Sequence, residues 1–226
     1  MKVLKGYKLI FSFFIIVLTT SGCGDSSHKP METTTSGLIH ISADESFKPV
    51  IDSQVQVFES LHKDAKVIVH YKPEAECLKD LDNDSIRMVL VTRGLTGAEE
   101  DRLAKKLSFR PRFGPIAYDA IAVITNNKSK DTVFTMQDIR SIAAGTSGYK
   151  YKMLLDGTSA TSTVRFVADS LLKGKLLSKN IVGASGSLGV IDYVSANNDA
   201  IGLIGVSWVG NKNDPQVLSF LDKVKI

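Results

Sequence analysis

The sequence predicts an α/β protein whose sheets are mostly parallel and flanked by helices. Short apolar segments of strand length alternate along the chain with segments in which apolar residues recur every three to four positions, and this alternation begins at Gly37. Parallel strands need a crossover connection, most often a helix, so repeated strand–helix alternation favours a parallel sheet covered by helices. No internal repeat or low-complexity tract interrupts the pattern.

Strands are predicted in the first half of the chain at 38–41, 66–71 and 86–91. Helices are predicted after each of them, beginning at Pro49, near Ala75 and after Thr96. Pro49 suits a first helical turn, because the missing N–H is not needed there. Thr96 and Glu99 have the spacing of a capping box, in which each side chain bonds the other residue's backbone N–H.

Strands are predicted in the second half at 116–125, 153–155 and 200–206, and the first of these is the longest apolar candidate. Helices are predicted at 135–142, 164–171 and 188–194. The Gly-rich segment 183–189 is interpreted as a loop into the last helix, because it lacks the strand–helix fingerprint of a dinucleotide site. Trp208 is interpreted as a core residue.

The N-terminal residues predict export. Lys2, Lys5 and Lys8 precede an apolar stretch at 9–18, which is too short to span a bilayer as a stable helix. Small and polar residues come next, and then Cys23. This layout resembles the lipobox of bacterial lipoproteins, in which the thiol is acylated and becomes the new N-terminus, although a Thr stands where Leu is usual. The alternative is an ordinary signal peptide followed by a chance cysteine.

The lipobox resemblance implies a signal peptide at 1–22, a lipidated Cys23, and a mature chain anchored to a membrane through that cysteine. Residues 24–36 are polar and lack apolar periodicity, so 23–36 is expected to act as a flexible tether. The protein is then expected in the periplasm or on the cell surface, lipid-anchored to a bacterial membrane.

Charge gives no reason to expect a nucleic-acid partner. The whole chain has 28 Lys and Arg against 24 Asp and Glu. Removing residues 1–22 removes three Lys and no acid, which leaves 25 against 24. The mature chain therefore lacks the basic excess that would attract a phosphate backbone.

Cysteine and histidine point to no metal or cofactor. Cys77 is the only Cys beside Cys23, so it is interpreted as a small buried apolar side chain rather than half of a disulfide. None of the four His stands at metal-ligand spacing with another His, Cys or acid. A phosphate-binding nucleotide loop and a Ser-His-Asp pattern are also missing from the sequence. We therefore expect no enzyme activity.

Hydroxyl-rich loops join a strand to a helix at 44–49, 91–96 and 156–163. A helix start offers free backbone N–H groups and the positive end of the helix dipole, so it favours anions. Arg93 and Arg165 stand near two of these loops and can bind a tetrahedral oxyanion through charge-assisted hydrogen bonds. Each loop alone is most simply a plain N-cap. Together they favour a binding site, because such loops gather at the carboxyl ends of parallel strands.

Five stretches of the chain follow one another in the order found in a known family; these stretches are 42–50, 91–96, 117–123, 161–166 and 200–208. They resemble the phosphate-binding proteins of bacterial ABC transporters, and the resemblance runs from about residue 37 to 210. The resemblance implies a two-lobed fold of the periplasmic-binding-protein type II class with a cleft between the lobes. It places one lobe at 37–115 together with 207–226 and the other at 116–206. Members of this family usually continue well past the last strand, so the C-terminus looks shortened.

The resemblance also implies a set of phosphate-binding residues, which are Ser46, Phe47, Thr92, Arg93, Asp119, Thr161, Ser162, Thr163 and Arg165. The family's third loop carries a Gly that this chain lacks. A carboxylate in this family accepts a proton from phosphate and so excludes sulfate. The candidates are Asp44, Glu45, Asp119 and Asp156, of which Asp119 is favoured.

The resemblance implies capture of inorganic phosphate by a monomer that delivers it to an ABC permease and its ATPase. One alternative is a binding protein or sensor for another oxyanion. A hydrolase of phosphate esters is disfavoured, because no metal cluster or activated nucleophile is present in the sequence. The remaining alternative is a surface lipoprotein that uses the fold as an interaction scaffold.

Overall fold

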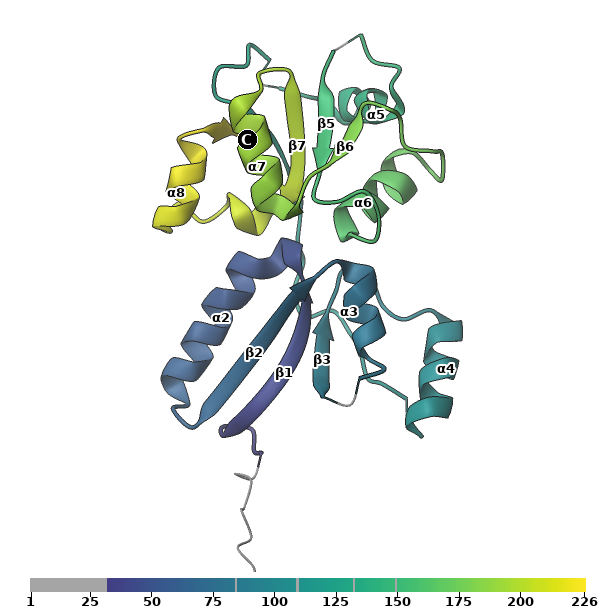
Figure 1. The fold of residues 1–226 in the computed structure, drawn as a ribbon, viewed down its shortest axis with the longest axis vertical. Coiled ribbons are helices and arrows are strands. Elements are labelled where there is room, and N and C mark those ends of the chain that lie inside the picture. The colour runs from purple at the N-terminus through teal and green to yellow at the C-terminus, as the bar shows by residue number, and fades with distance from the viewer. Residues whose placement is uncertain (1–31, 84, 109, 132, 149) are drawn as a thin grey trace, which may run out of the picture.

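The chain folds into two lobes, each built on its own sheet with helices packed around it (Figure 1). The computed structural model describes residues 32–226 except 84, 109, 132 and 149. The predicted signal peptide, the lipidated Cys23 and most of the predicted tether lie outside the described residues. Across the described part of the chain, no helix combines the length and the apolar character that crossing a membrane would take.

The first lobe has a three-stranded parallel sheet in the order β2-β1-β3. Its strands are β1 (Gly37–Asp44), β2 (Ala65–Lys72) and β3 (Ile86–Leu90). Its helices are α2 (Lys48–Leu61), α3 (Glu74–Asp80) and α4 (Gly97–Leu107). All three strands and all three helices agree in type with the prediction, and the predicted capping box of Thr96 and Glu99 forms at the start of α4.

Side-chain hydrogen bonds and an ion pair connect the sheet of the first lobe to α2 on one face and to α3 on the other. Tyr71 on β2 donates its hydroxyl to Asp52 of α2 at 2.6 Å. Lys72 of β2 and Ser42 of β1 both bond Asp80 of α3, at 2.7 and 2.5 Å. Because Tyr71 and Lys72 are consecutive on an extended strand, they point to opposite faces, so α2 and α3 cover opposite faces of the sheet.

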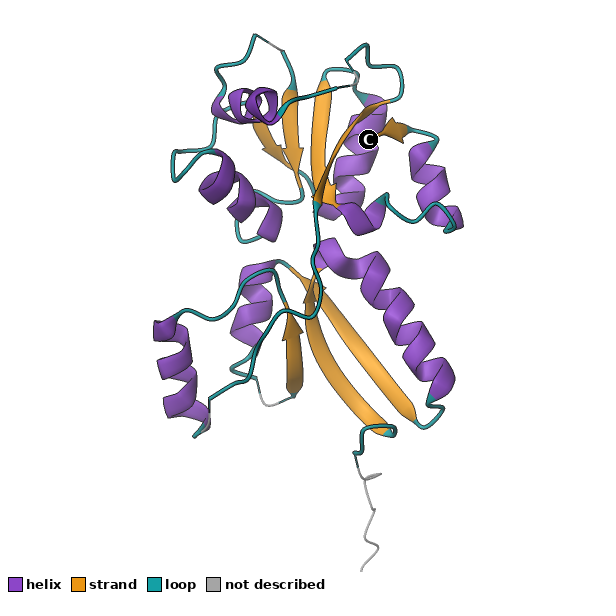
Figure 2. Ribbon diagram, turned by 180° about the vertical axis from the view of Figure 1, so that it is seen from behind, coloured by secondary structure: helices purple, strands orange, loops and turns teal. Residues whose placement is uncertain are grey.

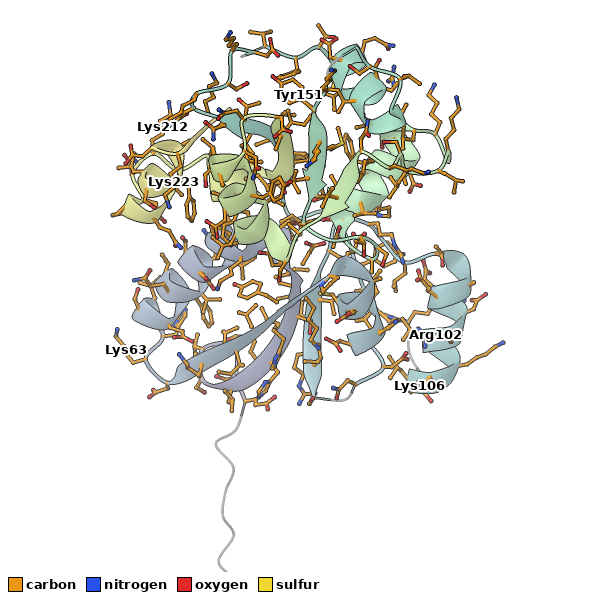
Figure 3. All side chains as sticks on the ribbon, turned by 45° about the horizontal axis from the view of Figure 1, so that its top comes forward. Lys63, Arg102, Lys106, Tyr151, Lys212 and Lys223 are labelled. Atoms are coloured by element: carbon orange, nitrogen blue, oxygen red, sulfur yellow. The ribbon has the colours of Figure 1, made fainter. Side chains whose placement is uncertain are left out.

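Helix α4 stands on the flank of the first lobe (Figure 3). Its Arg102 and Lys106 both pair with Asp82, at 2.6 and 3.4 Å. These side chains are half exposed, and exposed ion pairs contribute only about 0–1 kcal/mol each. The buried Leu103 is therefore the more important anchor of this helix.

The second lobe has a five-stranded mixed sheet in the order β6-β5-β7-β4-β8. Its strands are β4 (Ile121–Asn126), β5 (Lys152–Leu155), β6 (Ile181–Gly183), β7 (Ala200–Gly205) and β8 (Val224–Lys225). Strand β5 runs parallel to β6 and β7, whereas β4 runs antiparallel to β7 and β8. Its helices are α5 (Met136–Ala144), α6 (Ser162–Phe166), which continues as a π-helical turn to Leu171, α7 (Gly186–Ala196) and α8 (Pro215–Leu221).

Strand β7 is the centre of the second lobe, and every one of its residues is buried. Ile201 and Leu203 face a core formed with α5 and α6, while Ile204 faces a second core formed with α7 and α8. Gly202 lets α7 lie against the strand, because a Cβ there would stand 2.5 Å from Val190. The predicted α/β class with parallel-rich sheets flanked by helices is confirmed.

The predicted strand 116–125 is shorter in the structure, where β4 begins at Ile121. Residues before it form the crossover that carries the chain from one lobe to the other (Figure 2). Ile116 and Tyr118 are 82% and 99% exposed there. The apolar run at 116–120 therefore could not be distinguished from a buried strand by composition alone.

The prediction that 207–226 returns to the first lobe is wrong. Strand β8 pairs with β4 of the second lobe through Thr125 opposite Lys225. Trp208, Phe220 and Val224 are buried in the core that β4, β7 and α7 share. These three apolar side chains complete one face of the second sheet, which explains why the segment remains there. Trp208 is a core residue, as predicted.

Ile204→Ala should lower the free energy of unfolding by about 2–5 kcal/mol, because it leaves a cavity at a site with no solvent exposure. Urea unfolding followed by fluorescence of Trp208, the single Trp and a neighbour in the same core, measures this directly. Leu176→Ala is the control, since that side chain is 93% exposed and its loss should change stability by less than about 0.5 kcal/mol. Equal effects of the two substitutions would contradict the assigned core.

Candidate functional site

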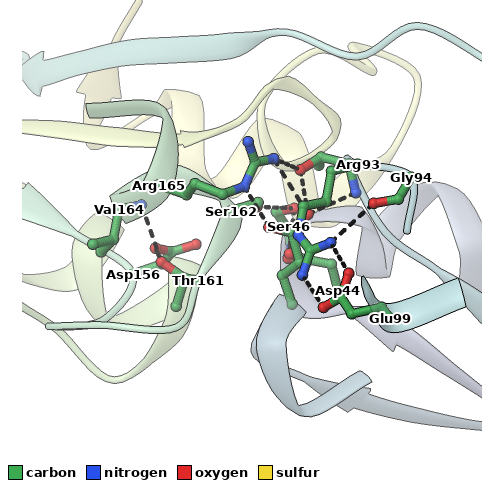
Figure 4. A network of polar contacts seen from close by, with 12 residues as sticks. Asp44, Ser46, Arg93, Gly94, Glu99, Asp156, Thr161, Ser162, Val164 and Arg165 are labelled. Carbon is green, nitrogen blue, oxygen red and sulfur yellow. Dashed lines mark hydrogen bonds and ion pairs between the residues drawn. The ribbon is translucent and has the colours of Figure 1, made fainter. Parts of the chain in front are cut away.

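The three predicted loops meet where the two lobes face each other. The first and second follow β1 and β3 of the first lobe, and the third follows β5 of the second lobe. The Ser46 hydroxyl lies 3.4 Å from the Ser162 hydroxyl, which joins the first loop to the third (Figure 4). Arg165, just after the third loop, donates to the Thr92 hydroxyl at 2.5 Å, which joins this part of the second lobe to the second loop. The carboxyl ends of strands from both sheets thus converge on one place, as in other open parallel sheets.

The first loop is organised by Asp44, which ends β1 and is only 1% exposed. Its Oδ1 accepts hydrogen bonds from the Ser46 N–H at 2.9 Å and the Ser46 hydroxyl at 2.8 Å. These bonds shape a short 3-10 turn, η1 (Glu45–Phe47), in which Phe47 precedes α2. Burial raises the pKa of Asp44 above its ordinary value despite the two bonds from Ser46. Its second oxygen, Oδ2, is buried without a hydrogen-bond partner among the described residues.

The third loop is organised by Asp156, which follows β5 and is 6% exposed. Its two oxygens accept from the hydroxyls of Thr161 at 2.7 Å and Thr163 at 3.0 Å. Thr161 is also the N-cap of α6, because its hydroxyl oxygen accepts from the N–H of Val164. Burial raises the pKa of Asp156. Ser162 and Thr163 hold the first two positions of α6, whose backbone N–H groups have no partner within a helix.

The second loop is bound by a residue that sequence reasoning missed, Glu74 at the start of α3. Its carboxylate accepts from the Thr92 N–H at 2.9 Å, the Thr92 hydroxyl at 2.5 Å and Arg165 Nε at 2.7 Å. Burial would raise the pKa of Glu74, but the hydrogen bonds from Arg165 and Thr92 outweigh it, so the pKa is lowered. The sequence signal for Glu74 was its place in the acidic first helical turn after β2. Because β2 runs parallel to β1, it ends at the same edge of the sheet as the strands before the predicted loops.

Two predicted site residues, Arg93 and Asp119, take no part in the described contacts that join the three loops. Arg93 forms a two-pronged ion pair with Glu99, with both distances 2.8 Å, and donates to the carbonyl of Gly94. The hydrogen bonds from Arg93 hold the pKa of Glu99 at about 2. Asp119 is exposed on the crossover, and no described contact joins it to the network around Asp44.

Further contacts across the lobe boundary hold the first loop against the second lobe. Glu45 accepts from the hydroxyl and N–H of Ser187 at the start of α7, at 2.9 and 3.2 Å. Ser207 donates to the carbonyl of Ser46 at 2.8 Å. Gly205 permits this approach, because a Cβ there would stand 2.6 Å from the Ser46 carbonyl oxygen. Substitution of Gly205 would push the two lobes apart at this point.

The site as a whole is rich in carboxylates and hydroxyls. The buried or nearly buried acids at the boundary are Asp44, Glu45, Glu74 and Asp156, and Arg165 is the cation that bonds directly to one of them. Such a site suits a ligand that carries both negative charge and protons to donate, because bare negative charge would meet the carboxylates. No group of three or more His, Cys, Asp or Glu side chains in the described ranges is arranged to hold a metal ion.

Comparison with known families gives one match over almost the whole chain. The profile of the PBP superfamily domain matches residues 29–226. No curated protein matches the sequence.

Solved structures with the same fold include transport and regulatory proteins. A candidate phosphate ABC transporter substrate-binding protein from Clostridium perfringens, with bound phosphate, is 19% identical with a TM-score of 0.66, and the match covers 84% of each chain. An ABC-type phosphate transport receptor from Vibrio cholerae is 15% identical with a TM-score of 0.51 and covers 75% of this chain and 72% of its own. A variant OxyR2 regulatory domain from Vibrio vulnificus is 10% identical with a TM-score of 0.59 and covers 86% and 82%. At these identities the likeness establishes the fold.

The three acids Asp44, Glu45 and Asp156 should favour the folded state more as the pH falls toward mild acid. Burial raises the pKa values of Asp44, Glu45 and Asp156, so between about pH 4 and those raised values the folded state binds more protons than the unfolded state. Their contribution to the free energy of unfolding should then rise as the pH falls through this window. Urea unfolding at a series of pH values measures the slope, and Asp44→Asn should make it shallower.

Asp138→Asn serves as the control, because hydrogen bonds from Thr135 lower the pKa of Asp138 and keep its titration below this window. That variant should retain the full slope. An equal slope in Asp44→Asn and in the unaltered protein would show that the Asp44 carboxylate is not destabilised by burial.

Proposed function

This chain belongs to the PBP superfamily, and we propose that it captures inorganic phosphate between its two lobes for an ABC transporter. The observation that carries the proposal is the convergence of the first and third loops with Arg165 at the lobe boundary. Ser46 and Phe47 come from one lobe, and Thr161, Ser162 and Thr163 come from the other. A tetrahedral anion bound there would be enclosed from both sides.

The donors suit an oxyanion. The start of α6 supplies backbone N–H groups and the positive end of a helix dipole, and Ser46 and Ser162 supply neutral hydroxyls. Arg165 supplies a guanidinium whose fork matches two oxygens of phosphate. Its side chain is 37% exposed, so part of the guanidinium remains open for a ligand. We propose that Thr92 completes the donor set, and that Arg93 acts at longer range through its charge.

We propose Asp44 rather than Asp119 as the acceptor of the phosphate proton. The Oδ2 atom of Asp44 is buried without a described partner, so a donated O–H bond would satisfy it. Phosphate keeps a proton at neutral pH, whereas sulfate has none to give. Sulfate would bring bare negative charge against a buried carboxylate, and this repulsion provides selectivity.

The proposed mechanism is binding without a chemical step. The lobes are joined by a crossover that can act as a hinge, and an anion that bonds both lobes would favour the closed arrangement. The closed complex would present the bound phosphate to a permease and its ATPase in the membrane.

We propose that the protein is exported and held at the membrane by an acylated Cys23, with residues 24–36 as a tether. The proposal rests on the signal-like residues 1–22 and on the small residues before Cys23. Cys23→Ser should move the protein from the membrane fraction to the soluble fraction of a bacterial host. Equal membrane association of both proteins would exclude the lipid anchor.

Calorimetric titration of the purified protein near neutral pH should detect binding of phosphate and no binding of sulfate. Arg165→Ala should weaken phosphate binding by about 1.5–3 kcal/mol, the usual contribution of a hydrogen bond to a charged group. Lys212→Ala is an exposed control on the second lobe and should bind as the unaltered protein does. Binding of molybdate or sulfate in preference to phosphate would favour a receptor for another oxyanion.

Asp44→Asn tests the selectivity within the same titration. The amide keeps the shape of the side chain and still accepts from Ser46, but it can donate toward an unprotonated anion. The variant should therefore bind phosphate less tightly and gain measurable affinity for sulfate. Unchanged selectivity in this variant would exclude Asp44 as the proton acceptor.

A further inference from the structure

We propose that Glu74 is an internal anion that holds the ligand-free lobes together and competes with the bound ligand for Arg165 and Thr92. We call the ion pair between Glu74 and Arg165 the clasp. The identity of the ligand rests on the proposed function, but the existence of the clasp does not. The clasp joins α3 to α6, whereas η1 meets the second lobe at Gly205 and Ser207.

The first observation is the donor set that Glu74 occupies. Its carboxylate accepts hydrogen bonds from the N–H and hydroxyl of Thr92 and from the Nε of Arg165. The Nη2 of Arg165 lies 3.4 Å from the same carboxylate. Backbone N–H, hydroxyl and guanidinium are the same three kinds of donor that bind an oxyanion. A carboxylate built into the chain thus fills positions that the anion would otherwise take.

The second observation is that this contact joins the lobes. Glu74 begins α3 in the first lobe, whereas Arg165 is on α6 in the second. Beside it, the N–H of Ala75 donates to the carbonyl of Ala160 across the same boundary at 3.0 Å. Arg165 also donates to the Thr92 hydroxyl across the boundary, so without the ion pair between Glu74 and Arg165 only these two described hydrogen bonds would remain beside it.

The third observation is the contrast in burial between the two partners. The Glu74 side chain is 3% exposed, while the Arg165 side chain is 37% exposed. A buried carboxylate that lost its guanidinium would be strongly disfavoured, so the closed arrangement depends on the pair remaining intact. The exposed part of Arg165 is where an incoming anion can first make contact.

Competition follows from charge. A phosphate that bonds Arg165 places its negative charge next to the Glu74 carboxylate, because both use one guanidinium. Either Glu74 yields some of its bonds or the two anions repel each other, and both outcomes weaken ligand binding. The Arg93–Glu99 pair has no such effect on closure, because both partners belong to the first lobe.

Glu74→Gln tests this directly, because the amide keeps the size of the side chain and removes its charge. The variant should bind phosphate about 5–150-fold more tightly, the usual range for a coupling between two binding events. Without ligand it should have a larger radius of gyration in X-ray scattering than the unaltered protein, because the clasp is weakened. Phosphate should return the variant to the compact form.

Asp80→Asn is the matched control. Asp80 is a partly buried carboxylate of α3 whose ion pair with Lys72 measures 2.7 Å, the same as that between Glu74 and Arg165, but it lies within the first lobe. This variant should change neither the phosphate affinity nor the radius of gyration. If Glu74→Gln does not fold, Glu74→Asp should show the scattering change in the same direction, because the shorter side chain cannot keep all of the bonds.

The possible results separate this proposal from the proposed function. Weaker or equal phosphate binding by Glu74→Gln would overturn competition and make Glu74 a residue that positions Arg165. An unchanged radius of gyration in the ligand-free variant would overturn the clasp. If no protein binds phosphate but Glu74→Gln expands, the proposed ligand is wrong and the clasp is supported.

Discussion

Burial of carboxylates at a boundary between two lobes is the constraint on which this structure depends. A carboxylate removed from water must receive hydrogen bonds or a cation, or its charged form becomes costly. Asp156 and one oxygen of Asp44 accept from hydroxyls of their own loops, while Glu45 and Glu74 also accept from donors of the opposite lobe. The needs of these acids therefore determine both the shape of the loops and the way the lobes meet.

The boundary has two sides with different character. On one side η1 packs against Gly205 and Ser207, close to Ala120, where the crossover enters the second lobe. A side chain at Gly205 would not fit there, and we propose that this close contact is the pivot when the lobes open. On the other side the lobes meet through Glu74 and Arg165, a contact that a ligand can exchange. A fold with a pivot and an exchangeable contact can open on one side without coming apart.

Much of this arrangement follows from local sequence patterns. Apolar periodicity identified most of the strands and helices, and the hydroxyl-rich loops at Ser46 and Ser162 do meet at the lobe boundary. These predictions succeed because strand ends and helix starts are local features, and parallel strands bring them to one edge. The strand predicted at 116–125 begins only at Ile121, because an exposed crossover and a buried strand can have the same composition. The features that could not be predicted depend on long-range contacts. Glu74 looks like any acidic residue in a first helical turn until Arg165, far along the chain, is placed beside it.

A crystal structure with arsenate, located by its anomalous scattering, would show where a tetrahedral anion binds, because arsenate has the charge and shape of phosphate. We expect one arsenic site between the lobes, with its oxygens bonded to Arg165, the start of α6 and Asp44. An ordered arsenate elsewhere on the molecule, with the lobe boundary unoccupied, would rule out the proposed anion site.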